Sequence, residues 1–82
     1  MINMIEGYIN KLTKHDVNNF AIKNNINLTS NELDFTYTFI KNNYKEVLNN
    51  KNNFNFNKYR SNFSEDSFNK IKNLINKYSS YL

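Results

Sequence analysis

The chain has no cysteine, proline or tryptophan and only one glycine among its 82 residues. Without cysteine it can form no disulfide and offers no thiolate nucleophile. A single glycine excludes a glycine-rich phosphate-binding loop. No apolar run reaches the roughly 18 residues that cross a membrane, and the first residues lack the basic and apolar regions of a signal peptide. We therefore expect a cytoplasmic protein that does not enter a membrane.

Catalytic motifs are also scarce. The single histidine, His15, stands beside Asp16. Neighbouring residues on a helix diverge by about 100°, so this pair does not converge on one substrate. The remaining acids have no second histidine or cysteine with which to hold a metal. The sequence predicts a non-enzymatic protein with no metal, no cofactor and no small-molecule substrate.

What the chain does contain is a strong compositional bias. Asparagine occurs twenty times and lysine ten times, against one arginine and one alanine. Asn, Lys, Ile, Phe and Tyr have AT-rich codons, so the bias indicates an AT-rich genome, consistent with a bacterial source. The charge is uneven as well: residues 1–48 are balanced, and the net charge of +4 belongs to residues 49–82. A basic C-terminal part is the first hint of a binding surface.

A six-residue motif occurs twice, as residues 12–17 (LTKHDV) and residues 28–33 (LTSNEL). In each copy a threonine is followed three residues later by an acid and then by an apolar residue. The hydroxyl can accept from the backbone N–H three residues on, while the acid accepts from the threonine N–H. The two pairs are Thr13 with Asp16 and Thr29 with Glu32. Each pair predicts the start of a helix.

Apolar spacing predicts about four helices, over residues 2–12, 14–24, 30–49 and from residue 64 onward. The expected apolar faces of the first two helices include Tyr8, Ile9, Leu12, Val17, Phe20 and Ala21. We expect an Asn-rich loop over residues 49–62, with one helical turn near residues 57–61. The cleanest amphipathic face belongs to the last helix, through Phe68, Ile71, Leu74 and Ile75. The whole chain is predicted to be a single all-α domain, 1–82, a compact bundle with a long third helix.

Aromatic residues supply the leading candidate site. Thirteen residues are Phe or Tyr, and each large ring can bury roughly 150–250 Å². Phe35 and Phe39 lie opposite the main apolar stripe of the third helix. Either this helix is central, with neighbours on both sides, or the two rings form an exposed patch for a partner. The candidate protein-interaction residues are Phe35, Phe39, Phe54, Phe56 and Phe63, and the partner could be a second copy of the chain.

The alternative is weak, sequence-nonspecific binding of nucleic acid. Such surfaces combine basic side chains for phosphates with rings that stack on bases. The candidate residues are Lys51, Lys58, Tyr59, Arg60, Lys70 and Lys77. A structural interpretation remains open beside it, in which the rings are core and the lysines are solvated.

Spaced residues in the first half carry a family resemblance. They are Leu12, Thr13, Asp16, Val17, Phe20, Ala21, Lys23, Ile26, Leu28, Thr29, Glu32, Ile40, Lys41 and Asn43. The pattern resembles a small uncharacterised all-helical family of low-GC Gram-positive bacteria, over roughly residues 10–80. The resemblance implies two Thr-started helices, a basic middle segment and a C-terminal helix, with no assigned activity.

Overall fold

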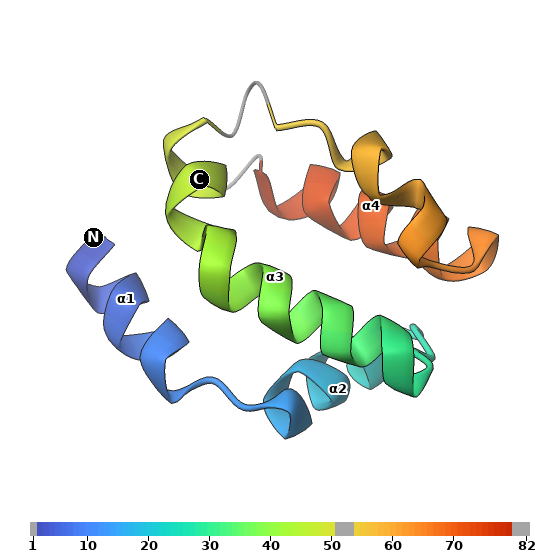
Figure 1. Cartoon of the computed structure of the whole chain (residues 1–82), viewed down its shortest axis with the longest axis horizontal. Coiled ribbons are helices and arrows are strands. Elements are labelled where there is room, and N and C mark those ends of the chain that lie inside the picture. The colour runs from blue at the N-terminus through green and yellow to red at the C-terminus, as the bar shows by residue number, and fades with distance from the viewer. Residues whose placement is uncertain (1, 51–53, 80–82) are drawn as a thin grey trace.

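The computed structural model describes residues 2–50 and 54–79, which fold into four α-helices and one 3-10 helix (Figure 1). The elements are α1 (Ile2–Lys11), α2 (Lys14–Lys23), α3 (Ser30–Asn49), the 3-10 helix η1 (Phe56–Asn62) and α4 (Glu65–Ser79). No β-strand occurs in these two ranges, so the predicted all-α class is confirmed. The long third helix is confirmed too. The single turn expected in the Asn-rich loop is instead the seven-residue helix η1.

Both threonine motifs start helices, as predicted. The Thr13 hydroxyl accepts from the Asp16 N–H at 3.1 Å, and the Asp16 carboxylate accepts from the Thr13 N–H at 3.1 Å. At the start of α3 the Thr29 hydroxyl accepts from the Glu32 N–H at 3.2 Å, and the Glu32 carboxylate accepts from the Thr29 N–H at 2.8 Å. These side chains satisfy N–H groups that have no partner within the helix.

Asparagine ends α2 as its conformational tolerance predicts. Asn25 adopts a left-handed conformation with φ of 63°, which Asn tolerates better than most residues. The chain then turns so that the Ile26 N–H donates to the Ala21 carbonyl at 2.8 Å. This geometry buries Ile26, which is 2% exposed, against the end of the helix.

One side of α3 packs on α1 and α2. Ile9, Leu12 and Val17 are the buried residues of this layer. The α3 side chains packed against them are Leu33, Tyr37, Ile40 and Tyr44. Two residues of the predicted apolar faces lie outside this layer: Tyr8 is 68% exposed and Phe20 is 48% exposed. The apolar faces of α1 and α2 are therefore wider than the core that α3 covers.

Lys41 on α3 links this helix to α1 through two hydrogen bonds. Its ammonium donates to the carbonyl of Ile9 at 2.7 Å and to that of Asn10 at 3.1 Å. Carbonyls in the last turn of a helix have no intrahelical partner, and they carry the negative end of the helix dipole. A lysine from α3 therefore caps the end of α1 and fixes where the two helices meet.

Candidate functional site: an apolar groove beside an aromatic cluster

The second side of α3 carries Phe35 and Phe39, whose rings meet rings from residues 54–63. Phe39 lies 4.9 Å from Tyr59 between ring centroids, and Phe35 lies 5.6 Å from Phe63. Ring pairs at such separations attract beyond their burial of apolar area. We call the connected set the aromatic cluster; its members are Phe35, Phe39, Phe54, Phe56, Tyr59, Phe63 and Phe68.

Phe68 joins α4 to this cluster. It is fully buried, and its ring stacks on that of Phe56 at 5.0 Å with only 8° between the planes. The Arg60 guanidinium lies 4.4 Å from the centroid of the Phe68 ring, within the range of a cation–π contact. The first turns of α4 thus contact the cluster through a stacked ring and a cation–π pair.

These contacts show which of the two predicted arrangements holds for Phe35 and Phe39 on α3. Helix α3 has α1 and α2 on one side and the rings of residues 54–63 on the other, so its predicted central position is confirmed. All five predicted interaction residues belong to the aromatic cluster, and all five are partly exposed. Their part in binding another protein stays a prediction.

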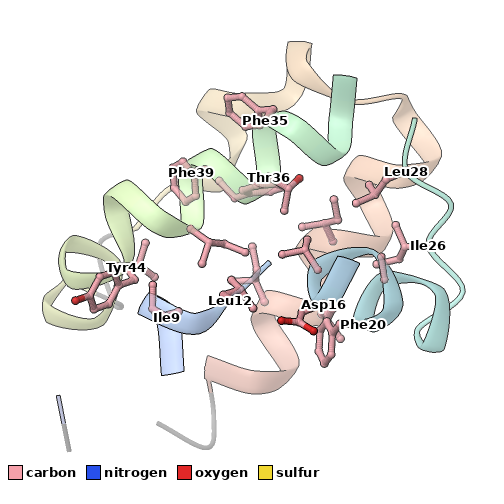
Figure 2. Close-up of a pocket in the computed structure, with 18 of the residues that line it drawn as sticks. Ile9, Leu12, Asp16, Phe20, Ile26, Leu28, Phe35, Thr36, Phe39 and Tyr44 are labelled. Atoms are coloured by element: carbon pink, nitrogen blue, oxygen red, sulfur yellow. The ribbon is translucent and has the colours of Figure 1, made fainter. Parts of the chain in front are cut away.

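An apolar groove of about 490 Å³ runs beside the cluster (Figure 2). Helix α3 contributes Thr36, Ile40 and Tyr44, and α1 and α2 contribute a wall that includes Ile9 and Phe20. The opposite wall comes from α4, through Ile71, Leu74 and Ile75. Ligand sites in proteins commonly enclose 300–1,000 Å³, so the groove has the size of a binding site.

The predicted interaction residues of α3 and of residues 54–63 lie together in this groove. It is lined by all five of the predicted interaction residues: Phe35, Phe39, Phe54, Phe56 and Phe63. Its polar lining residues are few, and two of them, Asp16 and Thr36, already bond to backbone groups of the chain. The groove therefore presents apolar surface with little capacity for directed hydrogen bonds.

Sequence reasoning missed the walls of this groove. The spacing places Tyr8 and Phe20 on the apolar faces of their helices, and Ile71, Leu74 and Ile75 on the apolar face of the last helix. In the structure Tyr8 and Phe20 are exposed, and the three α4 residues are partly exposed. The available signal was the width of these apolar faces, which exceeds what one neighbouring helix can cover.

Two lysines of α4, the candidate Lys70 and its neighbour Lys72, contact other protein atoms. Lys70 donates to the Asn25 carbonyl at 2.9 Å and pairs with Asp66 at 3.1 Å. Lys72 donates to the Asn57 side chain at 3.1 Å.

The remaining candidates for nucleic-acid binding lie in the aromatic cluster or at the end of α4, apart from one residue that is not described. The ring of Tyr59 belongs to the aromatic cluster, and the Lys58 ammonium lies 5.8 Å from its centroid. Arg60 lies over Phe68. Lys77 is exposed near the end of α4, and Lys51 lies outside the described residues.

One carboxylate is buried at the start of α3. Glu32 is 5% exposed; one of its oxygens accepts from the Thr29 N–H, and the other accepts from the Ser64 N–H at 2.7 Å. Ser64 precedes α4, and its hydroxyl accepts from the Ser67 N–H. The carboxylate thus ties the start of α3 to the start of α4.

Residues 2–50 and 54–79 contain neither a cluster of metal ligands nor a membrane-spanning helix. No three His, Asp or Glu side chains in these ranges gather closely enough to hold a metal ion. None of the helices described there has the length and apolar character needed to cross a membrane. His15 is exposed in the first turn of α2.

Comparison with protein-family models, with curated proteins and with solved structures finds no match to this chain. The resemblance to a small family of Gram-positive bacteria therefore stays a prediction. The functional argument that follows rests on the groove and the charges around it.

Proposed function

We propose that this protein is a non-enzymatic protein-interaction module whose groove receives an apolar segment of another chain. One observation carries the proposal: a groove of about 490 Å³, lined almost wholly by apolar side chains from all four α-helices and the aromatic cluster. The occupant is a partner protein or a second copy of the same chain.

Packing energetics support an occupant. Protein interiors are close-packed, and voids larger than a water molecule are few in a domain. Each apolar Å² removed from water contributes about 25 cal/mol. Tyr8 and Phe20, at 68% and 48% exposure, still have ring surface to bury. A partner that fills the groove would cover this surface as well as the partly exposed apolar residues of α4.

Helix α2 offers a matched pair of variants for testing the proposal. Phe20 lines the groove, whereas Ile22 is 54% exposed on the same helix and does not line it. We would select binders for the full chain from a random peptide library and measure their affinity for Phe20→Glu and for Ile22→Glu. We expect Phe20→Glu to weaken the selected peptides by about tenfold or more, because it places a charge in an apolar site.

Ile22→Glu should leave peptide affinity within about twofold, since surface changes away from a contact are nearly neutral. Circular dichroism establishes that both variants keep their helix content. Sedimentation velocity over a concentration series measures self-association in the same samples. The proposal fails if no peptide is enriched and the chain remains monomeric, or if both variants bind the selected peptides as the unchanged protein does.

Binding of nucleic acid is the competing function. Anisotropy of labelled single- and double-stranded oligonucleotides at about 50 and about 200 mM salt separates the two, because phosphate binding weakens steeply over this range. Micromolar binding that collapses at the higher salt and is lost in Lys58→Glu/Arg60→Glu would favour nucleic acid over a protein partner.

The proposal includes a cellular setting. A cytoplasmic location in a bacterium with an AT-rich genome is supported by the lack of cysteine and by the twenty asparagines and ten lysines. Reducing compartments do not sustain disulfides, and this chain depends on none.

A further inference from the structure

We propose that the groove is covered by a second copy of this chain, and that the two copies pair symmetrically through their grooved faces. This inference rests on the function proposed above and names the partner. It follows from the accessible surface of the chain, from the uncovered apolar face of α4, and from the different character of the two groove walls.

The chain exposes more surface than a compact monomer of its mass. Its accessible surface is 5959 Å² for 9.8 kDa, whereas folded monomers of that mass average about 5,160 Å². The excess is about 800 Å², which is roughly what each partner gives to an interface of standard size. Two copies that cover this excess on each other form an interface as large as a stable dimer needs.

Helix α4 supplies part of the uncovered apolar surface. A helix with one apolar stripe must bury that stripe against another element. Within residues 65–77, Phe68 is the apolar side chain of α4 that is buried, whereas Ile71, Leu74 and Ile75 line the groove and are partly exposed. Contacts within the chain thus bury the start of this stripe and leave the remainder for an occupant.

The two walls of the groove differ in a way that suits a two-fold axis. The wall from α1 and α2 carries projecting rings, since Tyr8 is 68% exposed and Phe20 is 48% exposed. The wall from α4 is aliphatic, and its side chains are more recessed. Each contact in a two-fold dimer occurs twice, with the two copies exchanging roles. The projecting rings of each copy therefore pack on the recessed α4 wall of the other.

The chemistry of the groove also suits a copy of the chain. Homodimer interfaces are more apolar than interfaces between proteins that bind transiently. The lining is almost wholly apolar, and two of its few polar side chains, Asp16 and Thr36, already bond to backbone groups. Each copy carries a net charge of +4, so repulsion opposes pairing at low salt and screening relieves it. Pairing is therefore driven by apolar burial and does not weaken as salt is added.

Sedimentation velocity of the full chain tests the pairing. Interfaces of standard size have micromolar or lower dissociation constants, so at about 100 μM protein the mass should approach twice the 9.8 kDa of one chain. The dissociation constant should be unchanged or lower at about 500 mM salt than at about 50 mM.

Four charge variants assign the pairing to the two walls. Tyr8→Glu alters the wall from α1 and α2, and Ile22→Glu makes the same change at a side chain that is 54% exposed outside the groove. Ile75→Lys alters the α4 wall, and Asn73→Lys is its exposed control on the same helix. Each wall variant should raise the dissociation constant by about tenfold or more, and each control should change it by less than about threefold. Circular dichroism checks that all four variants keep their helix content.

Mixing the two wall variants tests the reciprocal arrangement. A dimer of one variant with itself carries two altered contacts. In the mixed dimer the two new charges have opposite signs and face each other once, and the other contact between the walls is unaltered. An equimolar mixture of Tyr8→Glu and Ile75→Lys should therefore dimerise at least about fivefold more tightly than either variant alone.

Three outcomes overturn the inference. A chain that stays monomeric at about 100 μM, while library peptides bind it and are lost in Phe20→Glu, uses the groove for a different protein, and the function proposed above stands. A dimer that either wall variant leaves intact uses another surface. Wall variants that stay monomeric both alone and mixed show that the two walls do not face each other. A monomeric chain that also enriches no peptide removes the proposed function together with this inference.

Discussion

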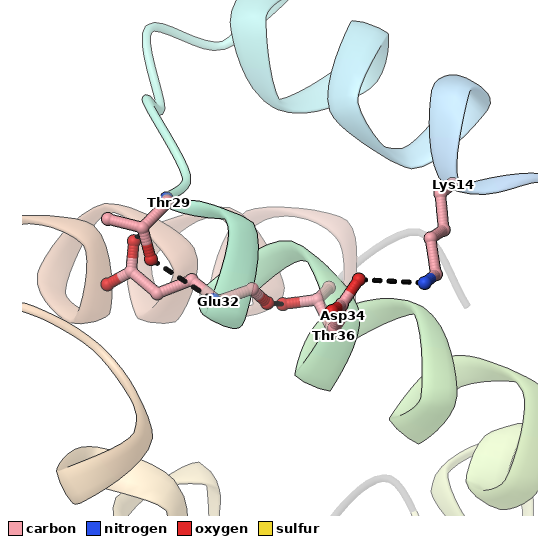
Figure 3. A network of polar contacts seen from close by, with 5 residues as sticks. All are labelled: Lys14, Thr29, Glu32, Asp34 and Thr36. Carbon is pink, nitrogen blue, oxygen red and sulfur yellow. Dashed lines mark hydrogen bonds and ion pairs between the residues drawn. The ribbon is translucent and has the colours of Figure 1, made fainter.

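The Thr13 and Thr29 capping boxes make the same pair of local hydrogen bonds but differ in what surrounds them. The first box is exposed, and its acid, Asp16, accepts from the Thr13 N–H and from no other donor within the described residues. The second is built on Glu32, which is 5% exposed and also accepts from the Ser64 N–H, 32 residues along the chain. Figure 3 shows the Thr29 box, with the Thr36 hydroxyl donating to the Glu32 carbonyl at 2.8 Å.

The difference lies in the second carboxylate oxygen. In both boxes one oxygen caps the helix on which it stands, as the dipole and the orphan N–H groups favour. At Glu32 the remaining oxygen reaches the start of α4 as well. A local cap has thus become a tertiary contact that holds α4 and the wall it gives to the groove.

The largest effect should come from Glu32→Gln. Glutamine has only one carbonyl oxygen, so its NH₂ group would face either the Thr29 or the Ser64 N–H, donor against donor. A buried donor left without a partner costs about 1–3 kcal/mol. The lost charge at two helix starts adds to this cost. Urea denaturation should show a fall in the free energy of unfolding of about 2–3 kcal/mol.

Asp16→Asn is the matched control for this change. Asparagine keeps one oxygen for the single Thr13 N–H, and water reaches the site. We expect a loss of only about 0.3–1 kcal/mol, the size of an exposed charge–dipole contact. Equal losses for the two variants would show that the bond to Ser64 does not contribute to stability.

An intermediate effect is expected from the threonines. Thr29→Ala and Thr13→Ala each remove one acceptor from a helix start, which costs about 0.5–2 kcal/mol. The loss should be larger at Thr29, because the bond to the Glu32 N–H is partly buried, whereas the Asp16 N–H is exposed and can bond to water.

Serine keeps the hydroxyl at both positions, so Thr29→Ser and Thr13→Ser should retain most of the stability in the same urea experiment. A larger loss at Thr13 than at Thr29 would reverse the comparison between the boxes. Loss in the serine variants equal to that in the alanine variants would mean that the hydroxyl bonds do not contribute.

The boxes also show what the sequence could predict. Each is a pattern within four residues, and the local geometry of a helix start determines its bonds. The same holds for the left-handed Asn25 at the end of α2. The bond from Ser64 to Glu32 could not be predicted, because it depends on how two helices far apart in the chain pack together.

At the candidate site, too, local patterns could be predicted from the sequence and long-range contacts could not. The sequence singled out Phe35, Phe39 and the rings of residues 54–63, and these share one groove. It did not indicate that Tyr8 and Phe20 remain exposed, because apolar spacing identifies a face but not the helix that covers it. Nor could it show that Lys70 and Lys72 bond to Asn25 and Asn57, since those distances are set by packing.

The smallest effect is expected from an exposed ion pair between α2 and α3. Lys14, next to Thr13, lies 2.8 Å from Asp34 on α3, with both side chains more than half exposed (52% and 58%; Figure 3). Exposed pairs contribute about 0.2–1 kcal/mol, and salt screens them. A double-mutant cycle with Lys14→Gln and Asp34→Asn should give a coupling energy below about 0.5 kcal/mol in low salt. It should fall toward zero at about 500 mM. A coupling near 1 kcal/mol that persists in high salt would mean that α2 is held on α3 by charge as much as by the Val17 layer.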